Sequence, residues 1–142
     1  MITKRFTQIF LGLMSLAFCK VGIEALINPH TVLAQVGILL DNASATSSMR
    51  AVYGGMHLMF GVYCISGIFK DSKGPLQLLT LYTAGFVLGR ITGIVADGSP
   101  NTFVMTWLIT ETVSLATAGT LLIVQGRRQR SGDDGHKAVI PV

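Results

Sequence analysis

The chain has 142 residues, of which 50% are hydrophobic and 13% are charged, and its mean hydropathy is +0.58. This composition excludes an ordinary water-soluble domain and predicts lipid as the surrounding solvent. The formal charge of +4 at pH 7 does not indicate nucleic-acid binding, because the basic residues gather at the two ends and in one short loop. We therefore interpret them as determinants of membrane topology.

The first predicted element is a membrane span over residues 6–27, ended by Pro29, which cannot continue a helix interior. Its start resembles a signal peptide, with one possible cleavage position in the LAFC segment and another after Ala34. Phe18 stands where the first position requires a small residue. Charged residues interrupt the apolar stretch before the second position, so we expect the first span to be retained.

Residues 29–48 divide into an apolar half, 32–40, and the polar segment DNASATSS. The apolar half is too short to cross a membrane, so we expect an interfacial or re-entrant helix there. The polar half is expected to be a loop that ends at Ser47 or Ser48, either of which could cap the next helix.

Three more spans are predicted, over residues 49–69, 76–95 and 102–124. The short KDSKGP connection makes spans two and three antiparallel neighbours, and the turn-forming DGSPN segment does the same for spans three and four. Residues 127–142 have little to bury and are predicted to form a disordered tail. The expected fold is therefore all-α: an integral membrane four-helix bundle in residues 1–126, with a short interfacial helix between spans one and two.

Basic residues outside the spans lie on one side of the membrane if the chain crosses it four times: Lys4, Arg5, Lys70, Lys73, Arg127, Arg128, Arg130 and Lys137. The opposite side carries Asp41 and Asp97, with Arg50 at the membrane edge. The positive-inside rule then places both termini in the cytoplasm. We expect a multi-pass protein of the bacterial inner membrane.

Ionisable side chains occur within or at the edge of the spans: Lys20, Glu24, Arg50, His57, Arg90, Asp97 and Glu111. A charge near the bilayer centre costs on the order of 2.5 to 3.5 kcal/mol, so such groups should face one another rather than lipid. From the rise per residue of a helix, Lys20, His57, Arg90 and Glu111 lie at nearly the same depth, in the half of the membrane toward the outer surface. The formal charges balance, which favours a neutral hydrogen-bonded cluster, and we predict an ion pair between Arg90 and Glu111.

Helical spacing places each of these groups in a stripe that also contains small residues, which is typical of close helix contacts in lipid. The stripes are Arg50, Gly54, His57, Gly61 and Cys64 on span two; Thr83, Phe86, Arg90, Gly93 and Asp97 on span three; and Trp107, Glu111, Ser114, Ala118 and Leu121 on span four. Span one differs, because its seam of Gly12, Ser15, Cys19 and Gly22 lies about 140° around the helix from Lys20 and Glu24. Those two charges either meet a different neighbour or extend toward the interface, and both alternatives remain open.

Several motifs carry a resemblance to a known family. Span two opens with Arg50-x-x-Tyr53-Gly54-Gly55, span three contains Gly89-Arg90 and ends in Asp97-Gly98-x-Pro100, and span four contains Glu111. The chain thereby resembles an uncharacterised bacterial family of four-helix membrane proteins, known only as a domain of unknown function. The resemblance implies the fold and adds no activity, and Lys20 and Glu24 lie outside its pattern.

The polar residues of the spans together form the candidate site: Lys20, Glu24, Arg50, Tyr53, His57, Arg90, Asp97 and Glu111. Three interpretations of this site are open. These residues could line a pocket for a small amphipathic ligand of lipid or quinone type. They could instead form a structural ion-pair network, or pair with a partner in a homo-oligomer or a larger membrane complex. Catalysis of the sterol-isomerase or phospholipid-modifying type is possible, but no spacing selects it, and no inverted repeat indicates a transporter.

No cofactor or metal is expected. His57 is the single histidine within a span, and one histidine is a poor ligand set for haem or zinc. It could take part in a proton relay with Glu111 or be a hydrogen-bonded histidine of the bundle. Cys19 and Cys64 both lie in apolar spans, where a thiol behaves as a small hydrophobe.

Overall fold

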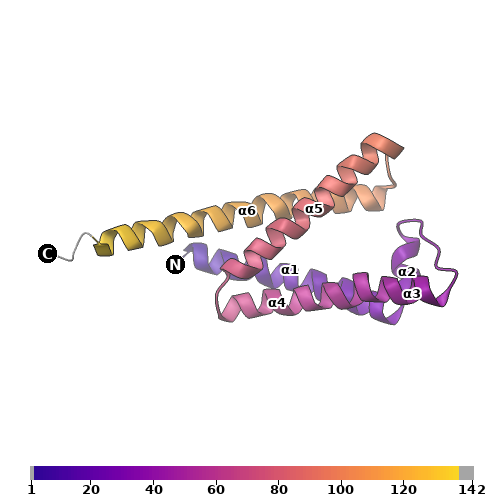
Figure 1. The fold of residues 1–142 in the computed structure, drawn as a ribbon, viewed down its shortest axis with the longest axis horizontal. Coiled ribbons are helices and arrows are strands. Elements are labelled where there is room, and N and C mark those ends of the chain that lie inside the picture. The colour runs from indigo at the N-terminus through magenta and orange to yellow at the C-terminus, as the bar shows by residue number, and fades with distance from the viewer. Residues whose placement is uncertain (1, 138–142) are drawn as a thin grey trace.

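The computed structural model describes residues 2–137, with side chains through residue 127. Within this range all regular secondary structure is helical, and there is no strand. The elements are α1 (Ile2–Ile27), α2 (Pro29–Ala34), α3 (Ala43–Met49), the π-helix η1 (Arg50–Met56), α4 (His57–Phe69), α5 (Lys73–Asp97) and α6 (Thr102–Lys137) (Figure 1). The predicted all-α four-helix bundle is confirmed.

Short polar side chains and glycine set the helix boundaries. The Asn28 side chain accepts a hydrogen bond from the Thr31 amide and starts α2, whose first residue is Pro29, where the missing amide hydrogen costs nothing. Gly98, with φ of 95°, ends α5 in a backbone conformation that side chains disfavour. The Asn101 side chain then accepts from the Val104 amide and starts α6.

The segment between the first two spans differs in part from its prediction. A short helix is present, but it covers Pro29–Ala34 rather than the apolar residues 32–40. The polar segment is not a loop, because Asn42 rather than Ser47 or Ser48 caps a helix that begins at Ala43. Its hydroxyl groups bond to carbonyl groups one turn back and so accommodate the helix, as Ser48 does with Ser44.

Helix α3 continues through η1 into α4, so that Ala43–Phe69 forms one membrane-length helix. The π-turn of η1 was not predicted. Such turns insert one extra residue into a helix and occur often at functional sites. Here the turn contains Tyr53 and ends immediately before His57.

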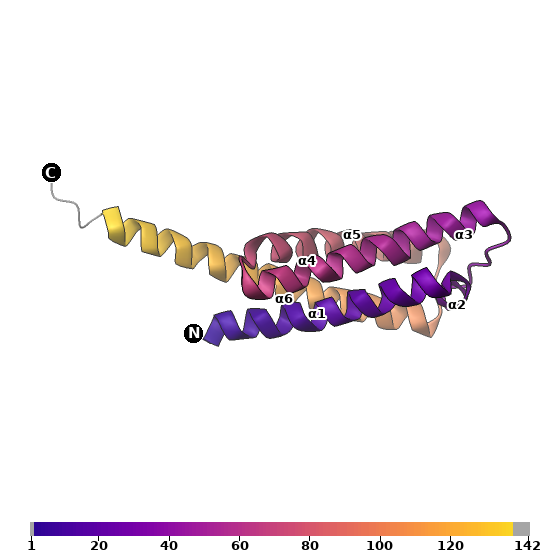
Figure 2. The ribbon, with the colours of Figure 1, turned by 90° about the horizontal axis from the view of Figure 1, so that it is seen from below.

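The helices form two pairs. Helix α1 packs along η1 and α4, and α5 packs along α6, whereas α4 and α5 meet near their connection and then diverge (Figure 1). Viewed from below, α4 and α5 lie on one side and α1 and α6 on the other (Figure 2). The predicted contact of spans three and four is confirmed, but the main partner of span two is span one. The reason is the seam of small residues on α1, where an added Cβ at Gly22 would lie 2.7 Å from the backbone nitrogen of Leu58.

One end of the bundle is tightly packed, and we call it the closed end. It holds the start of α1 and the α4–α5 connection, and α6 passes beside them (Figure 1). Leu11, Leu76 and Leu79 are buried in its core. The Gln125 side chain donates to Thr7 and Ser72, which links α6 to α1 and to the α4–α5 connection.

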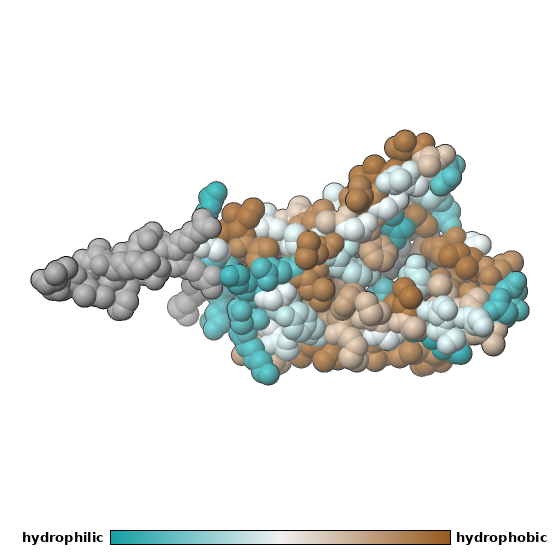
Figure 3. Space-filling view, viewed as in Figure 1, coloured by the Kyte–Doolittle hydropathy of each residue, from teal (hydrophilic) through white to brown (hydrophobic). Residues whose placement is uncertain are grey.

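The described chain contains four helices long and apolar enough to cross a membrane: Ile2–Ile27, Ala43–Phe69, Lys73–Asp97 and Thr102–Arg127. Large apolar side chains face outward on all of them, and they appear as brown areas in Figure 3. An apolar exterior of this kind requires lipid rather than water. The protein is therefore a multi-pass membrane protein.

The C-terminal part of α6 differs from its prediction. The helix does not end near residue 124 but continues to Lys137, beyond the other helices (Figures 1 and 2). No proline interrupts residues 125–137, although Gly126, Gly132 and Gly135 favour a helix less than other residues do. The predicted disordered tail is thus helical up to Lys137, and residues 138–142 lie outside the described part.

Candidate functional site

The opposite end of the bundle, which we call the α2 end, contains a cleft of about 760 Å³ between the two helix pairs. Pockets of roughly 300–1,000 Å³ are typical of sites for small organic ligands. In Figure 3 the surface is hollowed between the α5–α6 turn and the segment from α2 to α3. Most of the lining is apolar, and six aromatic side chains contribute to it: Phe18, Tyr53, Tyr82, Phe86, Phe103 and Trp107.

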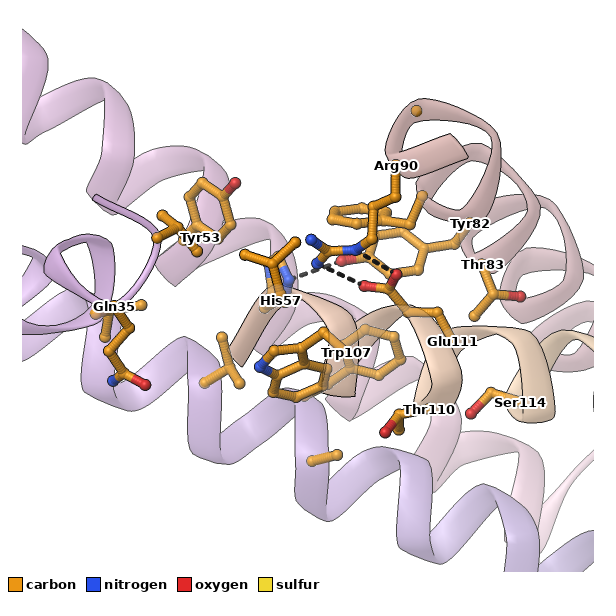
Figure 4. A pocket seen from close by; sticks show the side chains of 18 of the residues that line it. Gln35, Tyr53, His57, Tyr82, Thr83, Arg90, Trp107, Thr110, Glu111 and Ser114 are labelled. Atoms are coloured by element: carbon orange, nitrogen blue, oxygen red, sulfur yellow. Dashed lines mark hydrogen bonds and ion pairs between the residues drawn. The ribbon is translucent and has the colours of Figure 1, made fainter. Parts of the chain in front are cut away.

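The predicted pair of Arg90 and Glu111 is present on one wall of the cleft. The Arg90 Nε atom donates to one carboxylate oxygen of Glu111 at 2.6 Å, and Nη2 donates to the other at 2.9 Å (Figure 4). The two side chains are only 19% and 10% exposed. A bidentate pair in such surroundings is neutral as a unit and holds α5 against α6.

His57 forms a second polar pair with Tyr82, which lies on α5. The ring Nδ1 lies 3.1 Å from the carbonyl oxygen of Val52, and Nε2 lies 2.7 Å from the Tyr82 hydroxyl oxygen (Figure 4). The carbonyl can only accept, so Nδ1 carries a hydrogen. In the neutral imidazole Nε2 is then an acceptor, and the Tyr82 hydroxyl donates to it.

Aromatic contacts hold His57 and Tyr82 in place. Tyr53 stacks on His57 with ring centroids 5.6 Å apart, and the two residues are four apart around the π-turn. The Phe18 ring meets both His57 and Tyr82 edge-on, with centroids 5.8 and 5.2 Å away. Tyr82 also packs against Phe86, over which the Arg90 guanidinium lies at 5.9 Å. The two polar pairs therefore share one aromatic support.

The remaining candidate residues do not join this group. Lys20 and Glu24 line the cleft and pair with each other one turn apart on α1, at 2.8 Å, with side chains 70% and 49% exposed. Neither charge bonds to another helix among the described side chains. The expected single cluster of six charges is therefore wrong, and the pairs form separately.

Arg50 and Asp97 lie outside the cleft lining. The Arg50 Nε atom donates to the carbonyl of Leu26 at 3.0 Å, so it caps the last turn of α1. Its positive charge also interacts favourably with the negative end of the α1 dipole. Asp97 is exposed as the last residue of α5. Neither residue therefore joins the polar pairs of the cleft.

Sequence reasoning missed Tyr82 as a member of the site. A signal was available, because Tyr82, Phe86 and Arg90 are spaced four residues apart and share one face of α5. A tyrosine within a span also requires a hydrogen-bond partner for its hydroxyl. The predicted stripe began one residue later, at Thr83, which is buried and bonds to the backbone of its own helix.

No three His, Cys, Asp or Glu side chains gather closely enough to hold a metal ion within the part of the chain whose side chains are described. Cys19 and Cys64 are both free. The cleft thus offers hydrogen bonds, a paired guanidinium and carboxylate, and apolar contact.

Comparison with known proteins gives one match. The family model described as "Domain of unknown function (DUF4345)" matches residues 6–122. The chain belongs to this family. The match extends into all four membrane-length helices and includes α2 and every residue that lines the cleft. No curated protein matches the chain, and no solved structure does.

Proposed function

We propose that this membrane protein binds a small amphipathic ligand of the lipid or quinone type in the cleft at the α2 end. The observation that carries the proposal is the open cleft itself, of about 760 Å³, with mostly apolar walls and hydrogen-bonding groups at Arg90, Glu111, His57 and Tyr82. A purely structural ion pair would need no such space beside it. Apolar walls with a few placed polar groups suit a ligand that has a polar head and an apolar body.

Two glycines of α5 allow a test with a matched control. An added Cβ at Gly89, which lines the cleft, or at Gly93, which does not, meets no atom within 4 Å. Gly89→Leu should fill the cleft without displacing backbone, whereas Gly93→Leu makes the same chemical change on the same helix outside it. We expect lipid extraction and mass spectrometry to detect a near-stoichiometric amphiphile on the wild type and on G93L, and its loss from G89L. Equal ligand content in all three proteins would contradict the proposal.

A second candidate is that the Arg90–Glu111 pair only holds α5 on α6. The bidentate geometry between two directly packed helices favours it. This function predicts normal stability of G89L and no ligand on any of the three proteins. The same experiment therefore separates the two candidates.

We further propose that both termini face the cytoplasm of a bacterial inner membrane. The basic residues Lys4, Arg5, Lys70 and Lys73 lie at the closed end of the bundle, where Figure 3 shows a band of hydrophilic surface. A membrane-impermeant maleimide should label S72C only after the cells are opened, and S99C in intact cells with a permeable outer membrane. Labelling of S72C in intact cells would reverse the assignment.

A further inference from the structure

The donors and charges of the cleft indicate which head group it suits, provided that the proposed function holds. Arg90 uses Nε and Nη2 for Glu111, and its Nη1 atom has no partner among the described residues. The indole nitrogen of Trp107, another residue of the cleft lining, has no partner among the described residues either. No fully buried side-chain nitrogen or oxygen lacks a partner in the described range, so both nitrogens have accessible surface, and both belong to residues that line the cleft. In Figure 4 the free side of the Arg90 guanidinium points away from Glu111 toward His57 and Tyr53.

These free groups are donors, so they call for an acceptor on the ligand. A nitrogen of a guanidinium or an indole carries hydrogen and no lone pair suited to hydrogen bonding. The His57 ring adds no donor toward the cleft, because Val52 and Tyr82 occupy both of its nitrogens. A carbonyl-type oxygen on the ligand would complete the unused bonds of Arg90 or Trp107.

The charges of the lining argue against an anionic head group. The cleft contains two cations, Lys20 and Arg90, and two anions, Glu24 and Glu111, and they form two ion pairs. A phosphate or carboxylate entering beside Arg90 would meet a guanidinium that is already neutralised through two bonds. It would then repel Glu111 in surroundings of low dielectric, where an uncompensated charge is expensive.

The walls favour a flat apolar body next to that oxygen. Tyr53 and Phe86 stand beside His57 and Arg90, and Phe103 and Trp107 pack edge-on from α6 with centroids 6.2 Å apart. Aromatic faces stack readily on a planar ring. We infer that the ligand head held by the cleft is uncharged and carries a carbonyl oxygen toward Arg90 or Trp107, as in a quinone ring or the ester of a neutral glycerolipid.

Trp107 provides a direct readout, because it is the single tryptophan of the chain and lines the cleft. In detergent, decylubiquinone should quench its fluorescence saturably, and the G89L variant gives the background quenching within the micelle. Didecanoylglycerol and dodecyl phosphate are then compared as competitors. We expect decylubiquinone or didecanoylglycerol to bind about tenfold or more tightly than dodecyl phosphate, because the phosphate charge would repel Glu111 beside an already neutralised Arg90. The tighter of the two identifies the source of the carbonyl.

A charge substitution tests the same inference in reverse. E111Q leaves the Arg90 charge unpaired. In this variant the affinity for dodecyl phosphate relative to the carbonyl ligands should therefore rise by about tenfold or more compared with the wild type. If E111Q does not fold, the double variant R90L/E111L removes the pair together and should lose the selectivity between carbonyl and phosphate ligands. A wild type that prefers dodecyl phosphate, or variants whose selectivity is unchanged, would overturn this inference alone. Absence of saturable binding by all three ligands would instead overturn the proposed function.

Discussion

The two ends of the bundle use the same four helices in opposite ways. At the closed end, leucines from α1 and α5 are fully buried and Gln125 bonds to two neighbouring segments. At the α2 end, α5 has moved away from α4, and a cleft separates the helix pairs. Packing at the closed end thus positions the helices, and their divergence creates the space that a ligand could fill.

The glycines illustrate this difference. An added Cβ at Gly22 or Gly61 would meet backbone atoms of the facing helix, so these residues permit close contact of α1 with η1 and α4. Gly85, Gly89 and Gly93 on α5 have nothing within 4 Å of an added Cβ. The prediction that Gly93 marks a close helix contact is therefore wrong. Small residues in a span can serve tight packing or leave room, and sequence spacing alone does not distinguish these uses.

The largest effect is expected at the α2 end. Glu111→Leu leaves the Arg90 charge unpaired in the cleft wall and should lower the free energy of unfolding by about 3 to 5 kcal/mol. The double variant R90L/E111L should recover most of this loss, because it leaves no isolated charge. Unfolding by SDS in mixed micelles measures both. Additive losses in the double variant would show that the two residues do not act as a pair.

The α1–η1 contact should be the next most sensitive. Gly22→Ala places a methyl group against the backbone of residues 54 and 58, and should cost about 1 to 3 kcal/mol because backbone must shift. Gly93→Ala, with open space around it, should instead stabilise by up to about 1 kcal/mol through helix propensity. Equal effects of the two variants in the same unfolding assay would contradict the proposed close packing.

The leucine core tests how much the closed end contributes. Leu76 is 0% exposed, and Leu76→Ala should cost about 2 kcal/mol, the low end for such a cavity, because lipid supplies no hydrophobic driving force. Leu88 on the same helix is 68% exposed, so Leu88→Ala should change the unfolding free energy by less than about 0.5 kcal/mol. A larger loss from L88A would indicate that its outer face is buried in an oligomer.

The smallest effect is expected from the polar contacts of the closed end. Gln125→Ala removes the hydrogen bonds to Thr7 and Ser72 and should cost about 1 kcal/mol, since one such bond between membrane helices contributes about 0.6 kcal/mol on average. Gln77→Ala, a change of the same kind at an exposed position, is the control. A loss as large as that of L76A would mean that this polar layer, rather than the leucine core, holds the closed end together.

The sequence by itself determined the number of spans, the helical class and the pairing of Arg90 with Glu111. Lipid enforces all three, since apolar stretches of this length must be helical and charges within them must find partners. The short DGSPN turn makes α5 and α6 adjacent, and the positions 90 and 111 lie at similar depth on either side of it. Local information was therefore sufficient for this part of the site.

Only the tertiary structure decided the rest. That α1 pairs with α4, that a π-turn carries Tyr53, and that α5 diverges to open a cleft depend on how side chains of distant segments fit together. The same holds for Tyr82, which reaches His57 across 25 residues, and for Lys20 and Glu24, which pair with each other rather than with the buried charges. Helical periodicity specifies the face on which a residue lies, but packing against the other helices determines what that face meets.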